Sequence, residues 1–246
     1  MSKPLTPELA NIYALKAMMC SRTYIRDPER TEFPIEHLGW RKVDLKGNSV
    51  PKDENSYAPH SMAGKVLSNL QFDIWEKEGA QDTIFAFKGT DEKIDWLVSN
   101  AALGISIPYK SAKKKVHNYR KRFPSRHVSI TGHSLGGGLA LSVSVWLGLD
   151  SLVFNSSPRI FDGWRNANEP AERIAVFQRG DVLSILRNRW PKFLEKVPRE
   201  NIVQSSFDYN GENSHRMDLM AEGIVRQANS PVYVSMAQSI PTKVLT

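Results

Sequence analysis

One serine between two glycines, at the point where a strand meets a helix, constrains this chain more than any other feature of its sequence. Residues 128–131 (Val-Ser-Ile-Thr) are typical of a short buried strand, and Gly132-His133-Ser134-Leu135-Gly136 follows them directly. The apolar segment Leu135–Leu147 then has the composition of a buried helix. Strand, sharp turn and helix in this order form the Gly-x-Ser-x-Gly elbow. The elbow predicts that strand and helix pack closely, with the serine hydroxyl exposed where they meet.

Strand-like and helix-like segments alternate on both sides of this elbow. The expected strands are Thr83–Phe87, Val128–Thr131, Leu152–Phe154 and Ile174–Phe177, and the expected helices are Leu9–Met19, Asp91–Leu103, Val116–Phe123 and Leu135–Leu147. This alternation predicts an α/β fold with a mostly parallel central sheet and helices on both faces. The 246 residues suffice for a single domain. We expect residues 83–220 to form its catalytic core and residues 1–80 to form an N-terminal helix and loop-rich extension.

Ser134 is the candidate nucleophile, because the helix that follows it directs free N–H groups toward a developing oxyanion. The alternative is a structural, glycine-rich turn. After such an elbow the acid comes next and the histidine last, and His215 is the only one of the six histidines that follows Ser134. Asp181, just past the expected strand 173–177, is the candidate acid, and Asp208 is the alternative.

Other kinds of chemistry find little support in the sequence. The single cysteine, Cys20, lies in a helix-like apolar segment and is expected to pack in the core. No His, Cys and Asp cluster has metal-ligand spacing, so we expect neither a metal nor a cofactor. No apolar run is long enough to span a membrane, and the first residues lack the apolar segment of a secretory signal. We expect a cytoplasmic protein, with signal-independent export as the alternative.

The chain is basic, with 33 Lys and Arg against 26 Asp and Glu and a net charge of +7. Residues 109–126 hold eight basic side chains and no acid, and residues 187–199 hold five with one acid. Such patches suit an anionic lipid, a nucleic acid or an acidic protein, and solvated helix faces are the alternative. We expect no nucleic-acid partner, because no helix-turn-helix, zinc spacing or RNA-binding aromatic strand is present.

Five motifs in order along residues 83–220 resemble the class 3 lipase family, the fungal triacylglycerol lipase type. They are Lys88-Gly89-Thr90 with Asp95-Trp96, Gly132–Ala140, Ser156–Arg159, Arg179–Leu186 and His215. The resemblance implies an α/β-hydrolase fold with Ser134, Asp181 and His215 as catalytic triad. It also implies an oxyanion hole formed by the backbone N–H groups of Thr90 and Leu135.

The chain departs from that family at several positions. Lys88 stands in place of the usual arginine, Asn155-Ser156 replaces the usual Phe-Gly, and the Val-Pro that usually follows the acid segment is missing. The resemblance nevertheless implies a serine carboxylic-ester hydrolase acting on lipid esters, a phospholipase A or a lipase. The alternatives are an esterase of small soluble esters and a non-catalytic binding protein with a hydrolase fold.

Two segments favour a lipid substrate. Residues 101–108 are apolar and lie where the family often carries a lid, although a connection packed on the core is the alternative. Residues 185–198 mix Trp190 and Phe193 with basic side chains such as Lys192 and Lys196. This mixture suits peripheral contact with an anionic membrane surface, and an ordinary amphipathic loop is the alternative.

Overall fold

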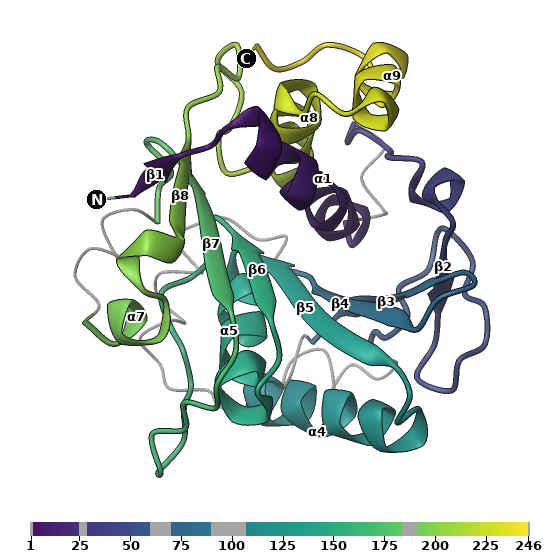
Figure 1. Ribbon diagram of the computed structural model, residues 1–246, viewed down its shortest axis with the longest axis vertical. Coiled ribbons are helices and arrows are strands. Elements are labelled where there is room, and N and C mark those ends of the chain that lie inside the picture. The colour runs from purple at the N-terminus through teal and green to yellow at the C-terminus, as the bar shows by residue number, and fades with distance from the viewer. Residues whose placement is uncertain (1, 25–28, 60–69, 90–106, 184–190, 246) are drawn as a thin grey trace.

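Figure 1 shows the computed structural model, which describes residues 2–24, 29–59, 70–89, 107–183 and 191–245. The strands are β1 (Lys3–Pro4), β2 (Trp40–Val43), β3 (Phe72–Lys77), β4 (Asp82–Phe87), β5 (His127–His133), β6 (Ser151–Phe154), β7 (Arg173–Gln178) and β8 (Ile202–Ser205). The helices are α1 (Pro7–Arg22), α4 (Ile107–Arg122), α5 (Leu135–Leu147), α7 (Pro191–Lys196), α8 (Met217–Gln227) and α9 (Pro231–Ser239), with short 3₁₀ turns η1 (Ile35–Leu38) and η2 (Arg199–Asn201).

The strands form one eight-stranded sheet in the order β1-β8-β7-β6-β5-β4-β3-β2. Strands β1 and β4 to β8 pair in parallel, and β2 and β3 pair antiparallel at one end. Helices lie on both faces: α1, α8 and α9 on one, and α4 and α5 on the other (Figure 1). The predicted fold class, a mostly parallel sheet covered on both faces, is confirmed.

Successive side chains of a strand point to opposite faces of the sheet, so each strand contributes residues to the packing on both faces. In β4, Ile84 and Ala86 pack into the apolar cluster of α1 and α8, whereas Phe85 and Phe87 pack into that of α4 and α5. Because both faces are covered, β4 and β6 are apolar over most of their length, as parallel strands usually are. This double layer holds the ends of β5, β6 and β7 at one edge of the sheet.

Several elements agree with the sequence prediction. Thr6 caps α1 through its side chain, which accepts the N–H of Leu9 (3.4 Å), and Pro7 opens the helix. Helix α5 has the predicted bounds and ends at Gly148 in the left-handed region. The expected helix at residues 91–103 lies outside the described residues. Among the helices of the described part, none combines the length and apolar character needed to cross a membrane.

Residues 1–80, expected as a helix with a loop-rich extension, supply the strands at both edges of the sheet. The sequence did not predict β3, because Asp73 and Glu76 interrupt its apolar residues. In the fold both side chains are buried and partnered. Asp73 accepts the N–H of Ser56 (3.0 Å), and Glu76 pairs with Arg126 (2.9 Å). In a sequence, an acidic residue usually indicates an exposed loop. It can lie in a buried strand only where a partner compensates its charge, and here that partner is distant in the chain.

Candidate active site

Ser134 lies on a strained turn between β5 and α5. Its backbone angles are φ 57° and ψ −126°, a region that residues other than glycine rarely adopt. Hydrogen bonds on both sides hold it there: its N–H donates to the Phe154 carbonyl (3.2 Å), and its own carbonyl accepts the N–H groups of Gly137 (3.0 Å) and Ser157 (2.9 Å). The predicted elbow is therefore present, and neighbouring strand ends support it.

Glycine is required on both sides of this serine. A Cβ on Gly132 would come within 2.3 Å of the Gly136 carbonyl oxygen, and a Cβ on Gly136 within 2.2 Å of the Phe87 carbonyl oxygen. Both obstacles are backbone atoms, which cannot rotate away as side chains do. The two glycines thus let β4, β5 and α5 approach one another at Ser134.

The structure brings the three residues of the predicted triad together. His215, in the loop before α8, has its Nε2 3.0 Å from the Ser134 Oγ and its Nδ1 2.6 Å from an oxygen of Asp181. Asp181 follows β7, is fully buried, and accepts the N–H of Leu183 (3.3 Å). The alternative acid, Asp208, lies elsewhere and accepts the N–H of Asn210 (2.9 Å).

This chain of contacts has a definite chemical capacity. The distance between Ser134 and His215 lies within the range for direct proton transfer. The carboxylate of Asp181 holds Nδ1 of the imidazole, so that Nε2 faces the hydroxyl. Buried Tyr209 lies close by, and its pKa is raised first by burial and then by the charge of Asp181. The arrangement can accept a proton from a hydroxyl that attacks an electrophile.

One of the two predicted oxyanion donors lies in the described residues. Leu135 is the first residue of α5, so its N–H is one of those that no turn of the helix uses. Thr90 lies outside the described residues, but Gly89 is placed beside the elbow. A Cβ on Gly89 would stand 2.9 Å from the Cβ of Ser134. Gly89, the last described residue before Thr90, therefore lies against Ser134.

Tyr24, just past the end of α1, supports this segment and was not predicted from the sequence. Its hydroxyl accepts the N–H of Gly89 (3.0 Å) and contacts Nδ1 of His133 (2.7 Å). Burial lowers the pKa of His133 well below its usual value, and the charges of His215 and Arg30 lower it further. His133 is therefore neutral near pH 7. No local signal marks Tyr24, because its partners Gly89 and His133 are 65 and 109 residues away in the chain.

The basic segment after the acid is only partly exposed. Residues 184–190 lie outside the described residues, but α7 shows that Phe193 and Lys196 are buried, with 1% and 2% of their surface exposed. The ammonium group of Lys196 pairs with Glu195 (2.9 Å) and Asp162 (3.8 Å). The expectation that Phe193 and Lys196 face a membrane is therefore wrong. Helical spacing turns both side chains inward, whereas Lys192 stays exposed.

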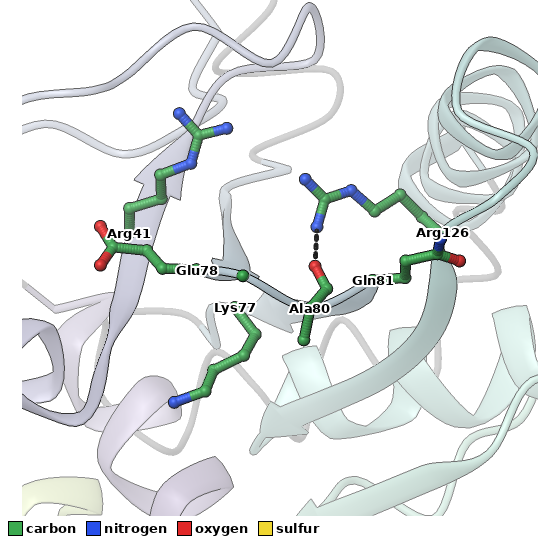
Figure 2. Close-up of a pocket in the computed structure, with 7 residues that line it drawn as sticks. Arg41, Lys77, Glu78, Ala80, Gln81 and Arg126 are labelled. Atoms are coloured by element: carbon green, nitrogen blue, oxygen red, sulfur yellow. Dashed lines mark hydrogen bonds between the residues drawn. The ribbon is translucent and has the colours of Figure 1, made fainter.

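A separate hollow of about 460 Å³ lies between Arg41, Lys77, Arg126 and residues 78–81. Figure 2 shows Arg126 bonded to the Ala80 carbonyl, with Arg41 across the hollow. Both guanidinium groups also bind the buried carboxylate of Glu76 (2.7 and 2.9 Å). The hollow lies where β5 begins, and β5 has seven residues, which puts the hollow about 23 Å from Ser134. It is not part of the triad site.

No group of three or more His, Cys, Asp and Glu side chains that could hold a metal ion is found in the described part of the chain. Cys20 is buried and contacts the Thr131 hydroxyl (3.1 Å), and burial raises the pKa of its thiol to about 12. A thiol with that pKa carries almost no thiolate near pH 7. Cys20 is thus a core residue, as the sequence indicated.

The chain is similar to known proteins in sequence and in fold. The family described as a Tle-like phospholipase domain matches residues 16–188. Rhizomucor miehei lipase, solved as a propeptide complex, aligns at 12% identity and TM-score 0.50, over 75% of this chain and 65% of that chain. A triacylglycerol lipase from Penicillium expansum aligns at 12% identity and TM-score 0.50, over 82% of this chain and 81% of that chain. A comparison with curated protein sequences finds no match.

A further solved structure is described as a triacylglycerol lipase whose catalytic centre is a serine protease triad. It aligns at 15% identity and TM-score 0.50, over 75% of this chain and 76% of that chain. The chain spans less than two thirds of the Rhizomucor lipase chain. At these identities the likeness establishes the fold, which is the α/β-hydrolase fold of the class 3 lipases. The predicted resemblance is confirmed at that level.

Proposed function

This chain belongs to the family of Tle-like phospholipase domains, and we propose that it hydrolyses carboxylic esters of lipids with Ser134 as nucleophile. The observation that carries the proposal is the contact series from Ser134 through His215 to buried Asp181, at 3.0 and 2.6 Å. The family match ends at residue 188 and so does not include His215. The geometry of His215 supports its role as base independently of the family match.

The proposed reaction begins when Nε2 of His215 takes the proton of the Ser134 hydroxyl. The Ser134 oxygen attacks the ester carbonyl and forms a tetrahedral intermediate with a negatively charged oxygen. When the bond to the alcohol oxygen breaks, His215 returns the proton to that leaving group, and an acyl-serine remains. Water then attacks the acyl-serine with His215 as base again, which releases the fatty acid and restores Ser134. Asp181 stays ionised and stabilises the imidazolium formed in each step.

In this proposal the backbone N–H groups of Leu135 and Thr90 stabilise the negatively charged oxygen. Support for Leu135 comes from its place at the start of α5, and support for Thr90 from the position of Gly89 against the elbow. Loss of one such donor typically lowers the rate by about 10²- to 10³-fold. The strained turn at Ser134 sets the Leu135 donor before substrate binds, so this part of the site requires little rearrangement.

We also propose peripheral contact with an anionic membrane surface. Because Phe193 and Lys196 of α7 are buried, this proposal rests on exposed basic side chains alone. Lys192 is exposed, and the face of α4 adds exposed Lys110 and Lys114. Each basic side chain near an anionic surface contributes about 1 kcal/mol. Phospholipid is preferred over neutral lipid as substrate for this reason and because of the family description.

The decisive experiment compares wild type with Ser134→Ala on vesicles of phosphatidylglycerol and phosphatidylcholine and on triacylglycerol emulsions, with products identified by mass. We expect wild type to release fatty acid and lysophospholipid, and Ser134→Ala to lose at least about 10³-fold of that rate. Equal rates would disprove the proposed nucleophile. Cleavage of short soluble esters alone would support the esterase alternative. No cleavage of any ester would favour the non-catalytic binding protein.

The inactive Ser134→Ala variant also isolates membrane binding from hydrolysis. Sedimentation with vesicles containing phosphatidylglycerol should retain more protein than with phosphatidylcholine alone, and added salt should weaken the retention. Lys192→Glu in the same background should reduce it, whereas Lys196 is not a usable position because it is buried. Equal retention by both vesicles would remove the membrane proposal and leave the ester hydrolase in place.

A further inference from the structure

Asn155 is an asparagine that the sequence marks only as a departure from the lipase pattern. It follows β6 directly, it is completely buried, and its φ of 39° lies in the left-handed region. Asparagine tolerates that region better than most residues, at some cost. A buried amide in an unfavourable backbone conformation requires compensation from its contacts.

The side chain of Asn155 spans two segments that are far apart in the sequence. Its Oδ1 accepts the backbone N–H of Gln178, at the end of β7, at 2.8 Å. Its Nδ2 donates to the backbone carbonyl of Ser214 at 3.4 Å. The first partner is a donor and the second an acceptor, so only one orientation of the amide satisfies both.

Each of these two partners is adjacent to a member of the proposed triad. The carbonyl of Gln178 accepts the N–H of Asp181 at 3.1 Å, in the turn that carries the acid. Ser214 directly precedes His215, the base. One amide side chain thus connects the acid-bearing turn to the base-bearing loop, beside the Asp181–His215 hydrogen bond.

The acid-bearing turn is also held from its other side. The side chain of Gln178 is buried, and its Oε1 accepts the hydroxyls of Ser205 (3.0 Å) and Tyr209 (3.1 Å) and the N–H of Phe207 (3.2 Å). Its Nε2 donates to the Phe207 carbonyl (2.9 Å). These bonds attach β7 to the segment after β8. Of these contacts, those of Asn155 are the ones that reach the residue next to His215.

We infer that Asn155 is a positioning residue, which sets the imidazole of His215 against Asp181 by tying the Ser214 carbonyl to the end of β7. The inference rests on the proposed Ser134–His215–Asp181 mechanism and goes beyond it. Asn155 has no contact with Ser134 or with the reacting atoms among its hydrogen bonds. Its substitution should therefore change how fast a correctly folded site turns over, while substrate binding stays the same.

Two variants distinguish the loss of the Asn155 side-chain hydrogen bonds from an effect of its backbone conformation. Asn155→Gly removes both hydrogen bonds and accepts the positive φ without strain, so the chain should fold. Asn155→Asp keeps the size and the acceptor for Gln178 but cannot donate to Ser214. Asn166→Gly is the matched control, because Asn166 also has a positive φ (45°) and lies on an exposed turn.

The first measurement is kcat and KM on a soluble ester, with active sites counted by a fluorophosphonate that labels the nucleophilic serine. We expect both Asn155 variants to lower kcat per labelled site by about 10- to 100-fold with KM unchanged. Asn166→Gly should match wild type. A kcat per labelled site within twofold of wild type would show that Asn155 has only a structural role and overturn the inference.

A second measurement needs no substrate and so separates this inference from the proposed function. The ¹⁵N chemical shifts of the His215 imidazole, assigned with His215→Gln, report which nitrogen carries the proton. We expect the proton on Nδ1 in wild type and Asn166→Gly, and a mixture of both forms in Asn155→Gly. If wild type cleaves no ester but this difference appears, the positioning role stands and the proposed function falls. Identical shifts in all three proteins would overturn the positioning role.

Discussion

Ser134, the proposed nucleophile, and its two partners are held in place by different means. Ser134 stands on a turn within one strand–helix unit, and close backbone approaches at Gly132 and Gly136 determine its position. Asp181 and His215 stand on loops more than 30 residues apart, and the buried amide of Asn155 links those loops. The first half of the site is a property of local backbone, whereas the second depends on a few side-chain hydrogen bonds between distant segments.

The difference predicts how each half fails. Backbone overlap at the elbow cannot relax without moving a strand, so a single methyl group there should abolish activity. Hydrogen bonds between the loops can be lost one at a time, so substitutions there should lower activity in steps and leave the fold largely intact. Three measurements test this contrast, in order of expected effect.

The largest effect is expected for Gly136→Ala. The added Cβ would meet the Phe87 carbonyl oxygen at 2.2 Å and the Lys88 carbonyl carbon at 2.7 Å. Since both are backbone atoms, β4 or α5 must shift, and we expect kcat/KM to fall by at least about 100-fold. Gly211→Ala, in the loop before His215, is the control, because no atom of the described residues lies within 4 Å of its Cβ position. It should cost about 1 kcal/mol of stability and keep activity. An active Gly136→Ala would contradict the backbone argument.

The second largest effect is expected for Gln178→Leu, at the end of β7 and next to the turn that carries Asp181. It leaves the N–H of Phe207 and the hydroxyls of Ser205 and Tyr209 without their buried acceptor. We expect the free energy of unfolding to fall by about 3 kcal/mol, as measured by urea denaturation, and kcat to fall by about tenfold. Gln204→Leu, the same substitution on the half-buried surface of β8, should change stability by less than about 0.5 kcal/mol. Similar losses in Gln178→Leu and Gln204→Leu would show that Gln178 has no specific role in holding the turn that carries Asp181.

The smallest effect is a pH dependence that arises beside the nucleophile. The folded-state pKa of His133 lies well below its unfolded value, so between the two values only the unfolded chain binds the proton. Stability contributed by neutral His133 is complete above about pH 6.5 and falls, as pH drops below it, by up to about 1.4 kcal/mol per pH unit. Urea denaturation at pH 7, 6 and 5 should show a steeper decline for wild type than for His133→Gln. Parallel declines would contradict a buried neutral His133.

Much of the fold could be predicted where the signal is local. The apolar run of β4, the Thr6-Pro7 start of α1 and the glycine-bounded α5 each depend on neighbours within a few positions. Strand β3 could not be predicted, because its buried Glu76 requires Arg126, 50 residues further along the chain. The exposure of the basic segment was misjudged at Lys196 for the same reason, since its partner Asp162 comes from another loop.

By itself the sequence predicted the elbow at Ser134, the fold class, and His215 as the candidate base, because it is the only histidine after Ser134. The elbow follows from residue type and spacing over short distances, where backbone geometry leaves few choices, and the fold class follows from the alternation of strand-like and helix-like segments. Only the tertiary structure decided that Asp181 rather than Asp208 faces His215, that Tyr24 supports Gly89, and that Asn155 connects the two loops. Those outcomes depend on hydrogen bonds between groups that the chain brings together only after its core has formed.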